Sequence, residues 1–203
     1  HLYLCIAGEL AAVICIHDPL RREARDAVAA LHACGIGKVV MMTGDNRQTA
    51  QAVAREVGVD AVYAEVLPED KAAFIRSEKA AGHTVIMVGD GVNDSPALSE
   101  ADAGVAISTG AAIAREIADI TIASEDLFEL VTLRRLSQAL MARIHRNYRF
   151  IVGFNLSLIL LGVAGLLPPT TSALLHNMST LGISLKSMTD LGPELPSPTP
   201  AER

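Results

Sequence analysis

Residues 87–98 read Met-Val-Gly-Asp-Gly-Val-Asn-Asp-Ser-Pro-Ala-Leu, so that an apolar strand ends in a polar loop. The loop carries two carboxylates and one amide, from Asp90, Asp94 and Asn93. Its glycines allow the backbone to approach a phosphate closely. Carboxylate oxygens, together with water and phosphate oxygens, are the usual ligands of Mg²⁺. The string therefore predicts a magnesium and phosphate site, since capping of the following helix would explain one of these residues but not all.

Two other polar segments follow the same plan. Thr43, Gly44 and Asp45 come directly after the apolar pair Met41-Met42. Thr43 could hydrogen-bond a phosphoryl oxygen and Asp45 could contact a nucleotide or a metal, although Thr-Gly-Asp is equally good turn chemistry. Lys71, in Pro-Glu-Asp-Lys, could neutralise a phosphoryl group in transfer, although a lone lysine on a helix is more often solvated. The order and placement of the three segments favour one shared site.

Up to about Asp126 the sequence alternates between short apolar strands and helices. After a hairpin of residues 1–7 and 10–17, helices are expected at 20–34, 47–57 and 68–82, and strands at 38–42, 61–64, 84–88, 104–107 and 120–123. This alternation predicts an α/β fold with a mostly parallel sheet covered by helices on both faces. Sites in such sheets lie outside the carboxyl ends of the strands, where the polar segments are.

The second half has a different character. A helix capped by Ser124 is expected to run to Leu167, and its charge-free part, residues 150–167, would span about 27 Å. Pro168-Pro169 breaks it, and a second apolar segment covers about 170–191. Together they predict a membrane hairpin, with a buried hairpin of a soluble domain as the alternative. The cytoplasmic side is indicated by a preceding arginine cluster: Arg134, Arg135, Arg143, Arg146 and Arg149.

The composition excludes one function class and adds little about metals. The chain has 203 residues and a net charge of −6, which argues against nucleic-acid binding. Its three cysteines show no ligand spacing and are expected to be buried cytosolic thiols. The first residue is His1 rather than Met, so the native amino terminus is expected to be absent. The Pro-rich tail, 193–203, is expected to be disordered.

Three segments resemble, in this order, the motifs of P-type ATPases, which have a haloacid-dehalogenase-like fold. They are Thr43-Gly44-Asp45, the Pro-Glu-Asp-Lys segment ending at Lys71, and the string from Gly89 to Leu98. Asp18-Pro19-Leu20-Arg21 is similar to the Asp-Pro-x-Arg hinge of that family. The resemblance covers residues 1 to about 192 and implies an ATP-driven cation pump. It implies that Asp90 is the main Mg²⁺ ligand, that Asn93 and Asp94 support the site, and that Lys71 and Thr43 hold the phosphoryl group.

The resemblance also shows which family motifs are absent. This chain has no Asp-Lys-Thr-Gly-Thr segment, which carries the phosphorylated aspartate, and neither a Thr-Gly-Glu loop nor a His-Pro signature of the nucleotide domain. By analogy, residues 1–124 are the carboxyl-terminal portion of the phosphorylation domain, 125–192 a stalk helix with two membrane helices, and 193–203 a cytoplasmic tail. The missing amino-terminal parts of the pump would supply a central strand. The isolated chain is expected neither to form a phosphoenzyme nor to pump.

A single hairpin after the phosphorylation domain is similar to heavy-metal pumps. Phe154-Asn155 falls where copper pumps have Tyr-Asn, and His176 falls where they have Met. Imidazole and oxygen ligands suit Zn²⁺, Co²⁺, Ni²⁺ or Mn²⁺, whereas Cu⁺ prefers sulfur. Polar residues in a membrane span are functional candidates, although His176 and Ser179 could instead join helices. The transported-ion candidates are Asn155, His176, Asn177, Ser179 and Thr180.

The expected function is therefore transport of a transition-metal cation by a multi-pass protein of the bacterial cell membrane, with the motif-bearing domain in the cytoplasm. One alternative is a soluble haloacid-dehalogenase-like phosphatase, which can carry a similar acidic loop. Another is an inactive truncated product that docks to a membrane or to a pump.

Overall fold

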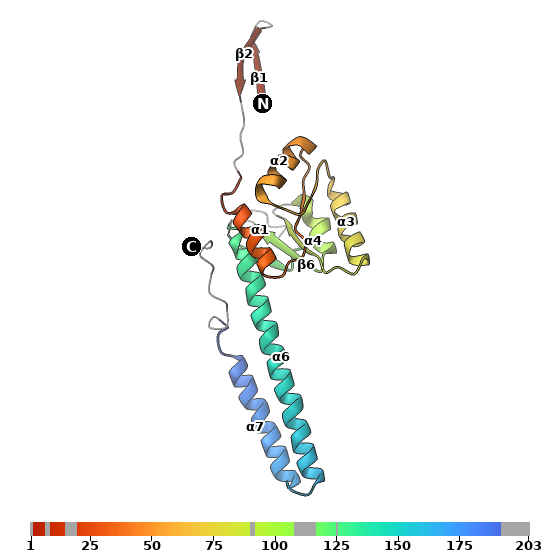
Figure 1. The fold of residues 1–203 in the computed structure, drawn as a ribbon, viewed down its shortest axis with the longest axis vertical. Helices are drawn as coiled ribbons and strands as arrows, with labels where there is room; N and C mark the ends of the chain where they lie inside the picture. Colours follow the sequence, from red (N-terminus) through yellow and green to blue (C-terminus); the bar gives the residue numbers. More distant parts are fainter. Residues whose placement is uncertain are drawn as a thin grey trace. The chain divides into compact units, whose positions relative to one another are not determined.

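The computed structural model describes residues 2–6, 9–14, 20–89, 92–107, 117–124 and 126–191. The chain divides into two compact units, residues 1–127 and residues 128–203 (Figure 1). Asp90, the hinge-like pair Asp18-Pro19 and the tail 193–203 lie outside the described residues.

The first unit begins with the expected hairpin, in which β1 (Leu2–Ile6) pairs antiparallel with β2 (Glu9–Ile14). Cys5 is exposed on this hairpin, whereas Cys34 is buried. The prediction of buried cysteines is therefore wrong for Cys5, because no described element covers its side of the hairpin.

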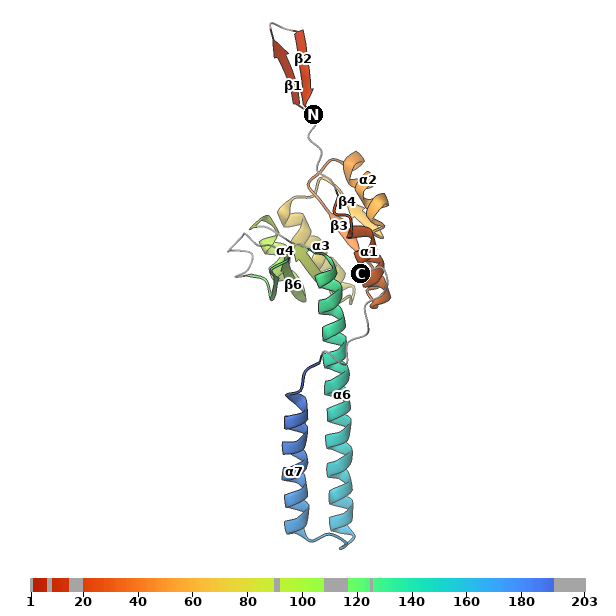
Figure 2. The same cartoon turned by 90° about the vertical axis from the view of Figure 1, so that its left-hand side faces the viewer.

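Parallel strands follow, as the alternation predicted. β3 (Val40–Met42) pairs with β4 (Ala61–Tyr63), and β5 (Ile86–Gly89), β6 (Ala103–Ile107) and β7 (Ile120–Ile122) pair in that order. Among the described residues these are two separate sheets (Figure 2), an incomplete arrangement of the kind expected for a chain that lacks a central strand. One edge of β3 and one edge of β5 therefore have no strand partner within the described ranges.

The helices of this unit begin and end largely where the sequence places them. They are α1 (Ala24–Ala33), α2 (Arg47–Val57), α3 (Pro68–Ala80), the 3₁₀ turn η1 (Val92–Asp94) and α4 (Ser95–Glu100). The Asn46 side chain accepts from the Thr49 N–H at the start of α2. Gly58 ends α2 with φ +81°, which favours glycine. The first helix begins at Ala24 rather than Leu20, because residues 21–24 form a turn closed by the Ala24 N–H on the Arg21 carbonyl.

A glycine sets the distance between α4 and the sheet. Ile75, Leu98 and Val105 are almost fully buried and form the centre of the core. A Cβ added at Gly104 would lie 2.6 Å from the Leu98 carbonyl oxygen. Only glycine therefore allows α4 to pack this closely on β6, and α4 directly follows the acidic loop.

Three aspartates share one role at the amino ends of the parallel strands. Asp60, Asp102 and Asp119 each stand just before a strand, and each accepts from a backbone N–H at or near the start of the neighbouring strand. The donors are Val39 (2.6 Å), Val85 (2.8 Å) and Gly104 (2.8 Å). The Val85 N–H, helped by Lys79, lowers the pKa of Asp102 below its ordinary value. We call this group the strand-start aspartates.

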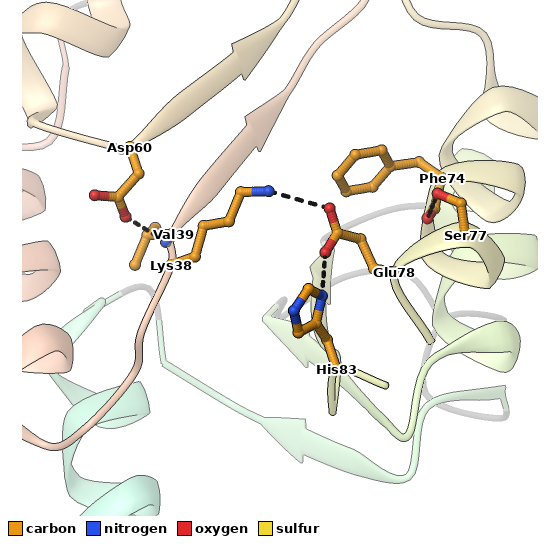
Figure 3. A network of polar contacts seen from close by, with 7 residues as sticks. All are labelled: Lys38, Val39, Asp60, Phe74, Ser77, Glu78 and His83. Carbon is orange, nitrogen blue, oxygen red and sulfur yellow. Dashed lines mark hydrogen bonds and ion pairs between the residues drawn. The ribbon is translucent and has the colours of Figure 1, made fainter. Parts of the chain in front are cut away.

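The same edge carries a contact between the two sheets (Figure 3). Glu78, on α3, accepts from Lys38 at 3.1 Å and lies 2.7 Å from Nδ1 of His83. Hydrogen bonding to Glu78 raises the pKa of Lys38, and hydrogen bonds from Lys38 and then His83 lower the pKa of Glu78. Lys38 precedes β3 and His83 precedes β5, so one carboxylate links the starts of both sheets.

The second unit is a helical hairpin. α6 (Phe128–Val163) and α7 (Pro169–Ser187) lie side by side in both views (Figures 1 and 2). Ser124 does not cap α6, because its hydroxyl accepts from the Asp126 N–H instead. α6 ends before the predicted Leu167, because Gly165 has φ +71° and the Leu166 N–H bonds back to the Leu161 carbonyl.

Within the described part of the chain, no helix combines the length and apolarity needed to cross a membrane. The predicted membrane-spanning pair is thus not confirmed. With α6 ending at Val163, its charge-free part from Phe150 rises only about 21 Å. α7 carries polar side chains along its length.

Candidate functional site

An ion pair joins two of the three predicted motifs. Lys71 Nζ donates to Asp94 Oδ1 at 2.7 Å, although the residues are 23 positions apart. The side chains are only 16% and 13% exposed, so the charges interact more strongly than a surface pair would. Lys71 lies in the first turn of α3, and Asp94 ends η1 just beyond β5. The structure therefore places a paired lysine and carboxylate at the carboxyl end of β5.

The loop after β3 is tied to the loop that leads into α3. The Thr43 N–H donates to the Tyr63 carbonyl at 3.0 Å, and the Val66 N–H donates to the Thr43 carbonyl at 3.0 Å. The Glu65 N–H donates to the Asp45 carbonyl at 2.9 Å, and Glu65 adopts a left-handed conformation, with φ 58°, at this point. These bonds fix the first motif relative to the start of the helix that carries Lys71.

Among the described residues, Thr43 and Asp45 of the first motif make no hydrogen bond to the ion pair. Thr43 Oγ1 accepts from the Asp45 N–H at 3.1 Å, which is the turn chemistry considered above. Gly44 and Asp45 are exposed, and so is Asn93, which neighbours Asp94 in η1.

The fit of Mg²⁺ to this site can be judged from Gly89 and Asp94. A Cβ added at Gly89 would lie 2.7 Å from the Asp94 Cβ and 2.8 Å from its Oδ2. The missing side chain therefore makes room for the carboxylate at the strand end. Carboxylate oxygens suit a hard divalent cation, so the chemistry of Asp94 fits the role of one Mg²⁺ ligand. No cluster of three or more His, Cys, Asp or Glu side chains that could hold a metal occurs among the described residues, and Asp90 lies outside them.

The hairpin brings together two of the five transported-ion candidates. His176 Nδ1, on α7, lies 2.8 Å from Asn155 Oδ1, on α6. Because an amide oxygen only accepts, this contact requires a proton on Nδ1, and in the tautomer of the neutral ring that satisfies it the lone pair is on Nε2. The Ser179 and Thr180 hydroxyls both donate to the His176 carbonyl within α7, and Asn177 is exposed. The contact suits either helix packing or a metal ligand held in one orientation.

Two features of these sites were missed by the sequence analysis. Gly89 was interpreted as a residue that allows a phosphate to approach, whereas the structure places it against Asp94. The pairing of Asn155 with His176 was not predicted either, although both were candidates. The sequence signal for the packing of Gly89 against Asp94 was a glycine at the last strand position before an acidic loop. The pairing of Asn155 with His176 becomes visible only from the register of the two helices in the hairpin.

Comparisons with known proteins agree with this geometry. The family model described as haloacid dehalogenase-like hydrolase matches residues 2–102. The chain is 45% identical over 174 residues to copper-transporting ATPase 2 of Rhizobium meliloti (strain 1021), covering 86% of this chain and 21% of that protein. It is 40% identical over 187 residues to the manganese-exporting P-type ATPase of Mycobacterium bovis, covering 92% and 26%.

A solved structure is similar over most of the chain. The crystal structure of a zinc-transporting PIB-type ATPase in its E2.Pi state superimposes with a TM-score of 0.81 and 30% identity, covering 90% of this chain and 30% of that one. The chain thus spans about a fifth to a quarter of the length of the two curated relatives above. The α/β domain has the haloacid-dehalogenase-like fold, and the chain belongs to the heavy-metal P-type ATPases.

Proposed function

We propose that this chain is part of a pump that uses ATP to move a transition-metal cation across a membrane through an aspartyl-phosphate. The observation that carries the proposal is the Lys71–Asp94 pair, which lies beyond the carboxyl end of β5 and against Gly89. Phosphoryl-transfer sites use a lysine to hold phosphate oxygens and carboxylates to hold Mg²⁺. The relatives named as copper, manganese and zinc transporters support the general class.

The residues of the site would divide the work between metal and phosphate. Asp90 and Asp94 would hold Mg²⁺, with Asn93 in support. When bound, Mg²⁺ offsets the negative charge of the phosphoryl group in transfer. Lys71 would move from Asp94 to a phosphoryl oxygen, and the Thr43 hydroxyl would donate to another. Asp45, in the exposed loop after β3, would contact the nucleotide.

The phosphorylated aspartate would come from the rest of the pump. This chain has no Asp-Lys-Thr-Gly-Thr segment. The unpaired edges of β3 and β5 support a strand supplied from elsewhere in the pump and lying between them. Ile86 and Val88 are 45% and 37% exposed on β5, although parallel strands are normally buried on both faces.

We also propose that the distal part of α6 and α7 form a membrane hairpin, with the first unit in the cytoplasm of a bacterial cell. The support is a set of exposed apolar side chains that water would not favour: Phe150, Ile151, Leu156, Ile159, Leu160, Val163, Leu174, Met178, Leu181 and Leu185. Flanking charged residues can extend the reach of a short span.

Thiol labelling tests the membrane proposal. In the complete pump, with Cys5, Cys15 and Cys34 replaced by Ser, a cysteine introduced at Leu160 is expected to resist a water-soluble maleimide in intact vesicles. A cysteine introduced at Glu129, in the first turn of α6, should react fully. Equal labelling of the two would overturn the membrane hairpin.

The His176–Asn155 pair supports a borderline metal as the cargo. In the neutral ring with Nδ1 donating to Asn155, the Nε2 lone pair would suit Zn²⁺, Co²⁺, Ni²⁺ or Mn²⁺ better than Cu⁺. A histidine whose other ring nitrogen donates to an oxygen is the common arrangement of a metal-binding histidine. The names of the relatives include both copper and manganese, so the preference for a borderline ion rests on this pair.

Substitution at the expected magnesium ligand tests the proposed function. Asp90→Asn in the complete pump is expected to abolish Mg²⁺-dependent phosphoenzyme formation, because transfer requires the metal to offset developing charge. Labelling with radioactive ATP measures it, and Asp26→Asn, on α1, is the matched control. Unchanged labelling of the Asp90 variant would show that Asp90 is not the magnesium ligand.

A further inference from the structure

Arg143 differs from the other arginines of its cluster because its side chain is buried. The residue is 6% exposed. Its Nη1 donates to the Thr189 carbonyl at 2.6 Å and its Nη2 donates to the Asp190 carbonyl at 2.9 Å. Thr189 and Asp190 come just after the end of α7 at Ser187. A residue that the sequence analysis counted in the cytoplasmic arginine cluster therefore holds the segment just after the second helix.

This contact belongs to one antiparallel register. One turn along α6, the Asn147 amide donates to the Ser187 hydroxyl at 3.0 Å. Farther along, Asn155 meets His176. The rise from Arg143 to Asn155 is about 18 Å and the rise from His176 to Thr189 is about 20 Å, because each residue adds about 1.5 Å. The three contacts are therefore satisfied together by a single alignment of the helices.

The chemistry of arginine suits this task. The Thr189 and Asp190 carbonyls follow the last turn of α7 and lie near the negative end of its dipole. A planar guanidinium that bonds two successive carbonyls defines both the rotation and the axial position of the chain that carries them. A buried guanidinium without such partners is strongly unfavourable. Turning α7 by one residue, about 100°, would carry His176 away from Asn155.

We propose that Arg143 is a positioning residue for the transported-ion site: it fixes the register of α7 on α6 and so keeps His176 paired with Asn155. The inference rests on the proposed function, since it assumes that His176 binds the cargo. The proposal gives Arg143 and Arg149 different roles. Arg149 is exposed on the same helix, so only its charge would matter.

The test uses the complete pump in vesicles, with ATPase activation measured for Zn²⁺, Co²⁺, Ni²⁺, Mn²⁺ and Cu⁺ added singly. Arg143→Gln is expected to raise the half-activating metal concentration about tenfold or more, as loss of a ligand-orienting partner does. Arg143→Lys should not restore the wild-type value, because an ammonium lacks the planar pair of donors. Asn147→Ala should give a smaller rise, and Arg149→Gln none.

Two further measurements separate this role from general misfolding. Phosphorylation from inorganic phosphate should survive in Arg143→Gln. In a His176→Ala background, Arg143→Gln should have no additional effect on metal activation, because residues acting through one another are not additive. An unchanged half-activating concentration in Arg143→Gln, full rescue by lysine, or lost phosphorylation from phosphate would overturn the positioning role alone. Unchanged activation in His176→Ala, or no activation by any metal, would overturn the ion site itself.

Discussion

The complete pump carrying Lys71→Met is expected to lose phosphoenzyme formation from ATP by at least about a hundredfold, which is the usual effect of removing one donor from a charge-stabilising site. In the present structure Lys71 offsets the Asp94 carboxylate at 2.7 Å, and both side chains are largely shielded from water. Without the ammonium, the carboxylate would repel an arriving phosphoryl group. Methionine keeps much of the length of the side chain, so the change isolates the charge.

Lys79→Met is the matched control, because Lys79 lies on the same helix. It is bonded to the Glu100 carbonyl at 2.8 Å and paired with Asp102 at 3.4 Å, away from the predicted motifs. Radioactive ATP would label the wild type and the control, but not Lys71→Met. If the two variants lost labelling equally, the effect would reflect the stability of α3 rather than a phosphate contact.

His176→Ala in the complete pump is expected to lower metal-stimulated ATPase activity by at least about tenfold, because loss of an outer-shell partner alone has that effect and His176 is the proposed ligand. Phosphorylation from inorganic phosphate should survive, since Thr43, Lys71 and Asp90 are unchanged. This separation follows because the proposed ion residues lie in the helical hairpin and the phosphate residues in the α/β unit. Metal would act on ATP hydrolysis only by biasing the same conformational equilibrium as phosphate.

Ser184→Ala provides the control for this experiment. Its hydroxyl donates only to the Thr180 carbonyl of its own helix, two turns beyond His176. Zn²⁺, Co²⁺, Ni²⁺, Mn²⁺ and Cu⁺ would each be tried as activator. If stimulation is equal in wild type and His176→Ala, the contact between His176 and Asn155 serves helix packing rather than ion binding.

The fold of the first unit was largely predictable because its signals are local. Alternating apolar runs, Gly58 after α2 and Pro68 at the start of α3 each act within a few residues. Periodicity alone did not predict that the sheet divides into two pieces, because pairing between strands depends on distant segments; the expectation of a missing central strand came from the family resemblance. The end of α6 was misplaced since Gly165 stops the helix before the apolar run ends.

In the candidate sites too, local signals were predictable and contacts between distant segments were not. The motifs identified Lys71 and Asp94 separately, and parallel-sheet topology placed both near one edge, but their contact depends on the packing of α3 against η1 and α4. Arg143 was predicted as a cytoplasmic charge because an arginine cluster before an apolar run has that meaning on average. Its burial depends on where α7 ends, which composition does not encode.

The strand-start aspartates give the α/β unit two chemically separate edges. Asp60, Asp102 and Asp119 use their carboxylates on backbone N–H groups at one edge, while the predicted phosphate residues occupy the other. In a mutational survey of the proposed pump that scores only metal transport, both groups of acidic residues would appear important. Variants of the strand-start aspartates would lower the number of folded molecules, whereas a variant at Asp90 would leave normal protein levels with slow turnover. Comparing transport with protein abundance would therefore distinguish the strand-start aspartates from the carboxylates of the predicted phosphate site.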